Sequence, residues 1–185
     1  RLSLLLVLVF TGFQSFSVDK YWRPVDNSFH NPANWDPVGI PSAADRIIFD
    51  QFGNADCVVY LDASVSGHLQ YNNYTGIVSL QPGVNYTVGN TGFWMDSGGF
   101  YSNDEELDIN GSLEVHGGGF LSSTAITHVA GNLELNPWPL GGWFTDAGII
   151  MIDGSAYTTL VSNVDVKHLQ MNKPFGYYMT IPAGM

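Results

Sequence analysis

Short apolar or alternating runs recur along most of the chain, and glycine or asparagine residues separate them. Alternation with a period of two is typical of half-buried β-strands, and short, evenly spaced runs indicate a sandwich, a barrel or a solenoid. The pattern therefore predicts an all-β protein. The strand candidates are Ile47–Phe49, Cys57–Leu61, His68–Tyr71, Ile77–Leu80, Tyr86–Val88, Val164–Met171 and Tyr177–Ile181.

Internal similarity favours the solenoid among these architectures. Gly98-Gly99-Phe100 recurs as Gly118-Gly119-Phe120, and Gly111-Ser112-Leu113-Glu114-Val115 recurs as Gly131-Asn132-Leu133-Glu134-Leu135, both at an offset of twenty residues; Gly154-Ser155 begins the pattern again. Such a period is typical of one coil of a β-helix, whose inward side chains stack on those of the neighbouring coils. We expect a right-handed parallel β-helix with coils of about twenty residues. A β-sandwich remains the alternative, because hairpins also produce weak repeats.

The first residues read as a targeting signal. Arg1 precedes an apolar run that ends near Phe13, and Ser15-Phe16-Ser17 places small residues where a signal peptidase cleaves. Residues 1–17 are therefore predicted to be a signal peptide, with an uncleaved anchor as the alternative. We expect the chain to be exported, and to continue beyond Met185 because its last predicted coil lacks a polar cap.

Residues 18–50 are rich in aromatic residues and proline, and we expect them to form an N-terminal cap on coils that occupy residues 51–185. Prolines in this segment argue against a helix or a central strand before Ser42. Trp22 and Trp35 are then best placed as a lid over the open end of an apolar core, with Ile47–Phe49 as the first buried strand.

Charge and cysteine content narrow the classes of partner. The formal net charge is −11, from 17 acidic and 6 basic side chains. Such a chain repels a phosphate backbone and an anionic membrane surface, so we expect no nucleic-acid partner and no membrane insertion after signal cleavage. The lone Cys57 lies in an apolar run, which indicates a buried small hydrophobe rather than a disulfide or a catalytic thiol.

An acidic cluster is the candidate for a metal site. Asp104, Glu106 and Asp108 supply closely spaced carboxylates of the kind that Ca²⁺ prefers. Their spacing matches neither an EF-hand nor a calcium-binding β-roll. A solvated corner is the stronger interpretation, and calcium is the only cofactor the sequence suggests.

A pair of glutamates is the candidate for catalysis. The repeat aligns Glu114 with Glu134, and both point outward if the flanking leucines and valine point inward. Carboxylate pairs serve glycoside hydrolysis, but no basic partner is evident in the sequence near these two. The five histidines also lack a zinc-ligand spacing. We therefore expect no enzymatic activity, with a carbohydrate-active β-helix enzyme (polysaccharide lyase or glycoside hydrolase) as the alternative.

Aromatic residues are the candidates for ligand binding. Trp94, Trp138, Trp143 and Tyr177 can stack on sugar rings if they are exposed. The alternative is that they fill the core or cover a loop.

The entry segment carries a family resemblance. Tyr21-Trp22, Asn31-Pro32-Ala33-Asn34-Trp35 and the stretch from Gly39-Ile40-Pro41 to Ile48-Phe49-Asp50 resemble the opening of large extracellular, adhesin-like β-helical proteins of Bacteroidetes. Arg23–Phe29 departs from the glycine-rich stretch usual there. A weaker likeness is to the cysteine-rich ectodomain of the amnionless receptor family.

The resemblance implies export through a type IX secretion system and a place on the cell surface. Together with the repeats it predicts a structural or adhesive module of a larger protein. Its expected partners are extracellular glycans, other surface proteins and downstream domains of the same chain.

Overall fold

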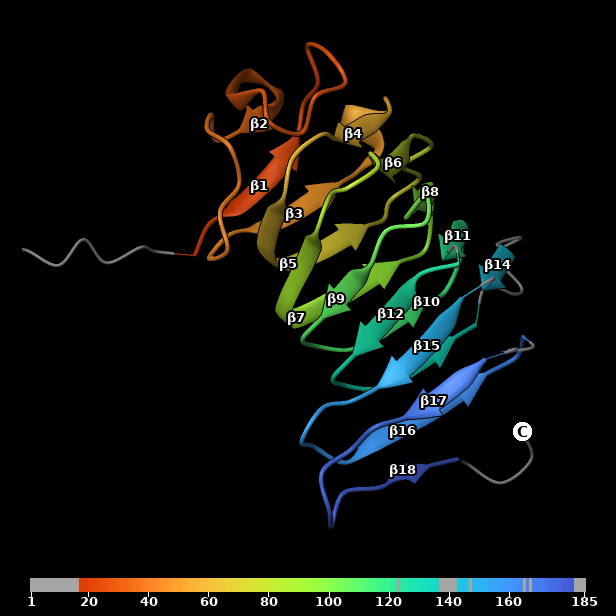
Figure 1. Cartoon of the computed structure of the whole chain (residues 1–185). Helices are drawn as coiled ribbons and strands as arrows, with labels where there is room; N and C mark the ends of the chain where they lie inside the picture. Colours follow the sequence, from red (N-terminus) through yellow and green to blue (C-terminus); the bar gives the residue numbers. More distant parts are fainter. Residues whose placement is uncertain are drawn as a thin grey trace, which may run out of the picture.

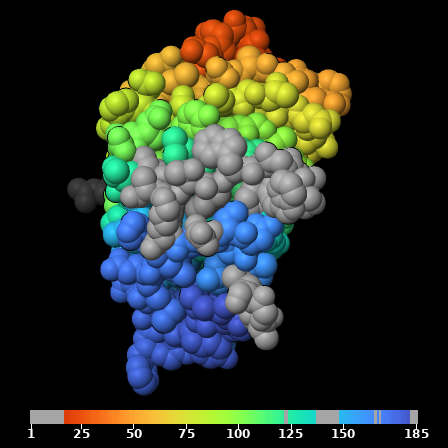
Figure 2. Space-filling view, turned by 90° about the vertical axis from the view of Figure 1, so that its right-hand side faces the viewer, coloured from red at the N-terminus to blue at the C-terminus, as the bar shows by residue number. Residues whose placement is uncertain are grey.

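The chain folds as an all-β parallel β-solenoid of about 6 turns, with coils of ~21 residues. This computed structural model describes residues 17–122, 124–136, 143–146, 148–164, 166 and 168–181, with the backbone alone for 122 and 143–146. The coils stack along one axis from the N-terminal end to the C-terminal end (Figure 1), so the colours of the chain follow one another as bands in the space-filling view (Figure 2). The predicted solenoid is confirmed, and the sandwich alternative is excluded.

Each coil contributes strands to three faces around a common core. Face A is a five-stranded parallel sheet of β4 (Cys57–Val59), β6 (Ile77–Leu80), β8 (Gly99–Tyr101), β11 (Gly119–Ser122) and β14 (Trp143–Asp146). Face B holds the first halves of β5 (Ala63–Gln70) and β7 (Tyr86–Met95), then β9 (Leu107–Ile109), β12 (Ile126–Val129), β15 (Ile149–Ile152) and β17 (Leu169–Met171). Face C holds β3 (Arg46–Phe49), the second halves of β5 and β7, β10 (Leu113–Val115), β13 (Leu133–Leu135), β16 (Thr158–Ser162) and β18 (Met179–Thr180).

The corner between faces B and C depends on glycine. The backbone of β7 turns there at Gly92, whose φ is +87°, and the alternation of buried side chains restarts at Phe93. A Cβ atom on Gly92 would lie 2.6 Å from the carbonyl oxygen of Ser112 in the next coil. Glycine is required at this point both for its left-handed backbone and for the close approach of two coils.

The strand register confirms the internal repeat. Gly99 and Phe100 pair with Gly119 and Phe120 on face A, and Leu113-Glu114-Val115 pairs with Leu133-Glu134-Leu135 on face C. The spacing then lengthens, since Leu133 pairs with Leu160. The twenty-residue period therefore describes the middle coils best.

The inward positions of all three faces fill one core. Leu113, Val115, Leu133 and Leu135 are all fully buried, as their alternation predicted. Cys57 is also fully buried, and burial raises the pKa of its thiol, so the prediction of a small hydrophobe is confirmed.

One histidine belongs to this core. His68 is fully buried and stacks between Phe49 and Phe93, with ring centroids 5.3 and 4.3 Å away. Its Nδ1 lies 2.8 Å from the hydroxyl oxygen of Tyr86. Burial lowers the pKa of His68 to about 3, so the ring is neutral at ordinary pH.

The N-terminal segment packs on the first coil. β1 (Asp19–Trp22) pairs in parallel with β3 and antiparallel with β2 (Trp35–Asp36). Trp22 and Trp35 are both buried, with ring centroids 5.1 Å apart, as expected of a lid over an apolar core. The Trp22 indole donates a hydrogen bond to the carbonyl oxygen of Ala55.

Two short 3₁₀ helices also occur, Pro32–Asn34 and Gln51–Gly53. The prediction that prolines exclude a helix before Ser42 is therefore wrong for one turn. Pro32 stands at the start of that turn, where its missing N–H costs nothing, and the Asn31 side chain accepts a hydrogen bond from the N–H of Ala33.

The predicted signal peptide falls almost wholly on residues 1–16, outside the described residues, and stays a prediction. Among the described residues, no helix has the length and apolar character needed to cross a membrane.

Candidate functional site

A row of outward side chains runs across the coils of face C. The parallel register places Leu69, Trp94, Glu114, Glu134 and Val161 one after another, each from the next coil. The first four point outward because both of their neighbours along the strand are buried, and Val161 follows the buried Leu160. The row therefore brings together side chains separated by about twenty residues or more in the sequence.

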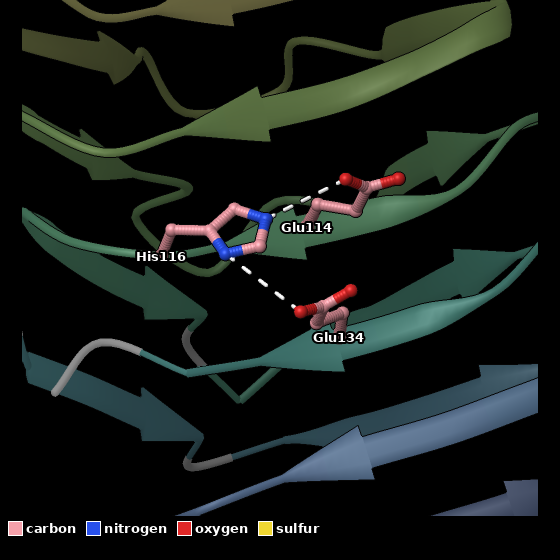
Figure 3. A group of neighbouring side chains, drawn as sticks. All are labelled: Glu114, His116 and Glu134. Atoms are coloured by element: carbon pink, nitrogen blue, oxygen red, sulfur yellow. Dashed lines mark hydrogen bonds and ion pairs between the residues drawn. The ribbon is translucent and has the colours of Figure 1, made fainter.

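Two residues of this row, Glu114 and Glu134, form a compact group with His116, which directly follows β10 (Figure 3). The Nε2 atom of His116 lies 3.5 Å from Oε2 of Glu114, and its Nδ1 atom lies 3.8 Å from Oε1 of Glu134. The side chains of His116, Glu114 and Glu134 are 28%, 37% and 36% exposed, respectively. One imidazole thus lies between two carboxylates that would otherwise face each other without compensation.

The sequence identified only part of this group. It predicted that Glu114 and Glu134 stack and point outward, and the register confirms it. The statement that no basic partner is near them is wrong, because His116 contacts both. A usable signal was present: positions i and i+2 of an extended segment lie on the same face, so Glu114 and His116 belong together.

Aromatic and amide side chains surround the group. The ring centroid of Trp94 lies 5.6 Å from that of His116 and 6.3 Å from that of Tyr71. The side-chain amide of Asn136 donates a hydrogen bond of 3.0 Å to Oε1 of Glu134. Trp94, a predicted ligand-binding residue, is half-buried beside this polar group.

Of the other predicted aromatic residues, Tyr177 is the one whose side chain the structure describes, and it does not join the group. Trp138 lies outside the described residues, and Trp143 lies in β14 on face A with only its backbone described. Tyr177 is 40% exposed and lies near Tyr157 and Tyr178, at the C-terminal end of the described coils. Binding by these three residues stays a prediction.

The acidic residues predicted for calcium lie elsewhere. Asp104 occupies a left-handed corner, with φ +71°, and its Oδ1 accepts a hydrogen bond from the hydroxyl of Thr124 in the next coil. Asp108 lies on face B in β9, where Oδ2 accepts a hydrogen bond from Asn110. Among the residues that the structure describes, these carboxylates do not form a compact metal-ligand group with Glu106.

Glu106 instead belongs to a second histidine cluster, on face B. Nδ1 of His128 lies 2.6 Å from Oδ2 of Asp153, and Nε2 lies 3.6 Å from Oε1 of Glu106. Burial alone would lower the pKa of His128, but hydrogen bonds and charge from Asp153 and Glu106 outweigh it and raise the pKa. Glu106, Asp108 and His128 line a recess of about 360 Å³.

The two carboxylate groups lie on different faces. Glu114 and Glu134 belong to β10 and β13 on face C, whereas Asp108 and the His128 cluster belong to face B, across the glycine corner. Glycoside hydrolysis requires an acid and a second carboxylate on opposite sides of one scissile bond. Glu114 and Glu134 instead stand side by side in one ladder and share one imidazole.

Comparison with protein-family models, with curated proteins and with solved structures gives no match to this chain.

Proposed function

We propose that the chain is a non-catalytic module of an extracellular β-solenoid protein, with a structural and adhesive role, and that it binds glycans along face C. The observation that carries the proposal is the position of Trp94 and Tyr71 beside Glu114, His116 and Glu134. An aromatic ring offers a surface for the apolar face of a sugar, and adjacent carboxylate and imidazole groups bind its hydroxyls.

The solenoid supports this role by its geometry. Neighbouring strands of a parallel sheet are spaced about 4.8 Å apart, so an outward row presents side chains at regular intervals. A repeating polymer can contact such a row over several coils, and weak contacts then add. An elongated surface of stacked coils suits the binding of a polysaccharide more than the enclosure of a small molecule.

Export and a surface location are part of the proposal. They rest on the apolar N-terminal run of residues 1–17 and on the resemblance of the entry segment to adhesin-like surface proteins. The acidic balance, with a net charge of −11, favours neutral or cationic glycans over sulfated or uronic polymers.

The test is a glycan array probed with the chain, followed by titration of the best binder with two variants. Trp94→Ala is expected to lower affinity by about tenfold or more, since an aromatic anchor contributes well over 1 kcal/mol. Tyr60→Ala removes an exposed ring, 46% accessible, that follows β4 on face A, and is expected to have no effect. Equal losses in both variants, or no glycan binding by the unmodified chain, would contradict the proposal.

A further inference from the structure

We propose that Glu114, His116 and Glu134 form a binding site for a divalent transition-metal ion, with Zn²⁺ as the representative probe. One ligand atom from each residue, the imidazole nitrogen and two carboxylate oxygens, can be chosen so that all three lie within 4.8 Å of one another. His116 lies between the carboxylates of Glu114 on β10 and Glu134 on β13, with one ring nitrogen toward each (Figure 3). The site requires no glycan and goes beyond the proposed function.

The ligand set decides the class of metal. An imidazole nitrogen and two carboxylate oxygens suit Zn²⁺ and neighbouring transition metals, whereas Ca²⁺ takes oxygen ligands almost exclusively. Three protein ligands leave a coordination position open to solvent. Because the side chains are about one-third exposed, an ion can reach them and small side-chain rotations can close the site.

The fold holds the ligands in place before a metal arrives. Glu114 and Glu134 are directly paired in the ladder of β10 and β13, so their backbones are fixed relative to each other. The Asn136 amide hydrogen-bonds one carboxylate, and the Trp94 ring packs beside the imidazole. Hydrogen-bonded neighbours of this kind orient metal ligands and strengthen binding.

The neighbouring charges explain why a cation is favoured here. Like charges that stand opposite each other in a ladder repel. A divalent ion neutralises both. Because a metal ion displaces protons from its ligands, affinity is expected to fall as the pH is lowered.

The second histidine cluster supplies a matched control. His128 also has two acidic neighbours, one at each ring nitrogen as at His116, but the described residues there do not form a compact three-ligand group. Cys57, the single cysteine, is buried and cannot compete for the metal. His116→Gln and His128→Gln each remove one imidazole. The first is expected to weaken zinc binding, and the second is expected to leave it unchanged.

The experiment is calorimetric titration of the untagged chain with ZnCl₂, paired with thermal unfolding in the presence and absence of zinc. We expect one zinc ion per chain, an affinity loss of about tenfold or more in His116→Gln and in Glu134→Gln, and no loss in His128→Gln. Zinc should raise the unfolding temperature of the unmodified chain and of His128→Gln, but not that of His116→Gln. Excess CaCl₂ should not displace the bound zinc ion.

Three results would overturn the proposal: no zinc binding by the unmodified chain, unchanged binding in His116→Gln, or loss in His128→Gln alone. Circular dichroism checks that each variant is folded. If His116→Gln fails to fold, Glu114→Gln and Glu134→Gln carry the same test, because each replaces an outward ligand by a side chain of the same shape.

Discussion

Glu114 and Glu134 occupy directly paired positions in the parallel ladder of β10 and β13, and His116 lies within 4 Å of both carboxylates. Two acidic side chains in this relation destabilise a sheet unless a partner compensates them. The imidazole of His116 is the polar partner that contacts both carboxylates, and a metal ion can take the same role.

Removing the imidazole should expose the repulsion between the two glutamates. His116→Leu is expected to lower the free energy of unfolding by about 0.5–1 kcal/mol at neutral pH, because paired acids then stand alone in a partly solvated ladder. Adding Glu134→Gln should recover most of that loss. Urea unfolding of the two single variants and the double variant, in metal-free buffer, measures the coupling; strictly additive effects would show that His116 does not compensate the pair.

The corner glycines allow backbone strain to be separated from close packing. Gly92 and Gly83 both have positive φ, +87° and +83°, but a Cβ on Gly92 meets Ser112 whereas a Cβ on Gly83 has no atom within 4 Å. Gly83→Ala should cost about 1 kcal/mol from strain alone. Gly92→Ala should cost about 2–3 kcal/mol more, since the backbone of the next coil must move. Equal losses in chemical unfolding would contradict the close stacking of coils at this corner.

His68 should make the fold sensitive to acid. Its folded pKa is about 3, below the unfolded value of about 6.5, so the unfolded state binds the proton first. Stability is then full above about pH 6.5 and falls toward pH 3 by up to about 1.4 kcal/mol per pH unit.

His68→Phe removes this titration and keeps an aromatic ring between Phe49 and Phe93. It should be less stable than the unmodified chain at pH 7, because the Tyr86 hydroxyl loses its partner, and should lose less stability on acidification. Tyr86→Phe is the control, since it removes the same hydrogen bond but retains the imidazole. Urea midpoints measured from about pH 7 to pH 4 should fall steeply for Tyr86→Phe and gently for His68→Phe; parallel slopes would exclude His68 as the cause.

The contribution of His128 to stability should depend on pH in the opposite sense to that of His68. Its pKa is raised in the folded chain, so its contribution is fully present below the unfolded value of about 6.5 and is lost as pH rises through the folded value. Asp153→Asn should therefore reduce stability by about 1 kcal/mol or less below pH 6, with a smaller difference at pH 9. A difference that does not change with pH would mean that the contact of 2.6 Å is an uncharged hydrogen bond.

The repeats made the middle coils predictable because residues one repeat apart occupy equivalent positions in neighbouring coils of a solenoid and stack on each other. Phe100 and Phe120 stack with ring centroids 5.5 Å apart, as their shared Gly-Gly-Phe context implied. The pairing of β1 with β3 could not be read in the same way. Lys20 pairs with Ile47 across a cap that carries no repeat, so no local pattern specifies the contact.

The site was predictable only in part, for a related reason. The offset of twenty residues identified Glu114 and Glu134, whereas His116 lacks a histidine at the matching position of the next coil, where Asn136 stands. His116 therefore belongs to no pattern of repeated or paired histidines in the sequence. Alternation along a single strand, rather than similarity between coils, brings His116 to the carboxylates.

Face C, around Trp94, is proposed to be the surface that contacts a ligand. Hydroxyl-radical footprinting of the chain with and without its best-binding glycan tests this directly, because aromatic and imidazole side chains are oxidised according to their exposure. Oxidation of Trp94, Tyr71 and His116 is expected to fall when the glycan is bound, while that of Tyr60 on face A is unchanged. Protection of Tyr60 with no change at Trp94 would contradict the proposal.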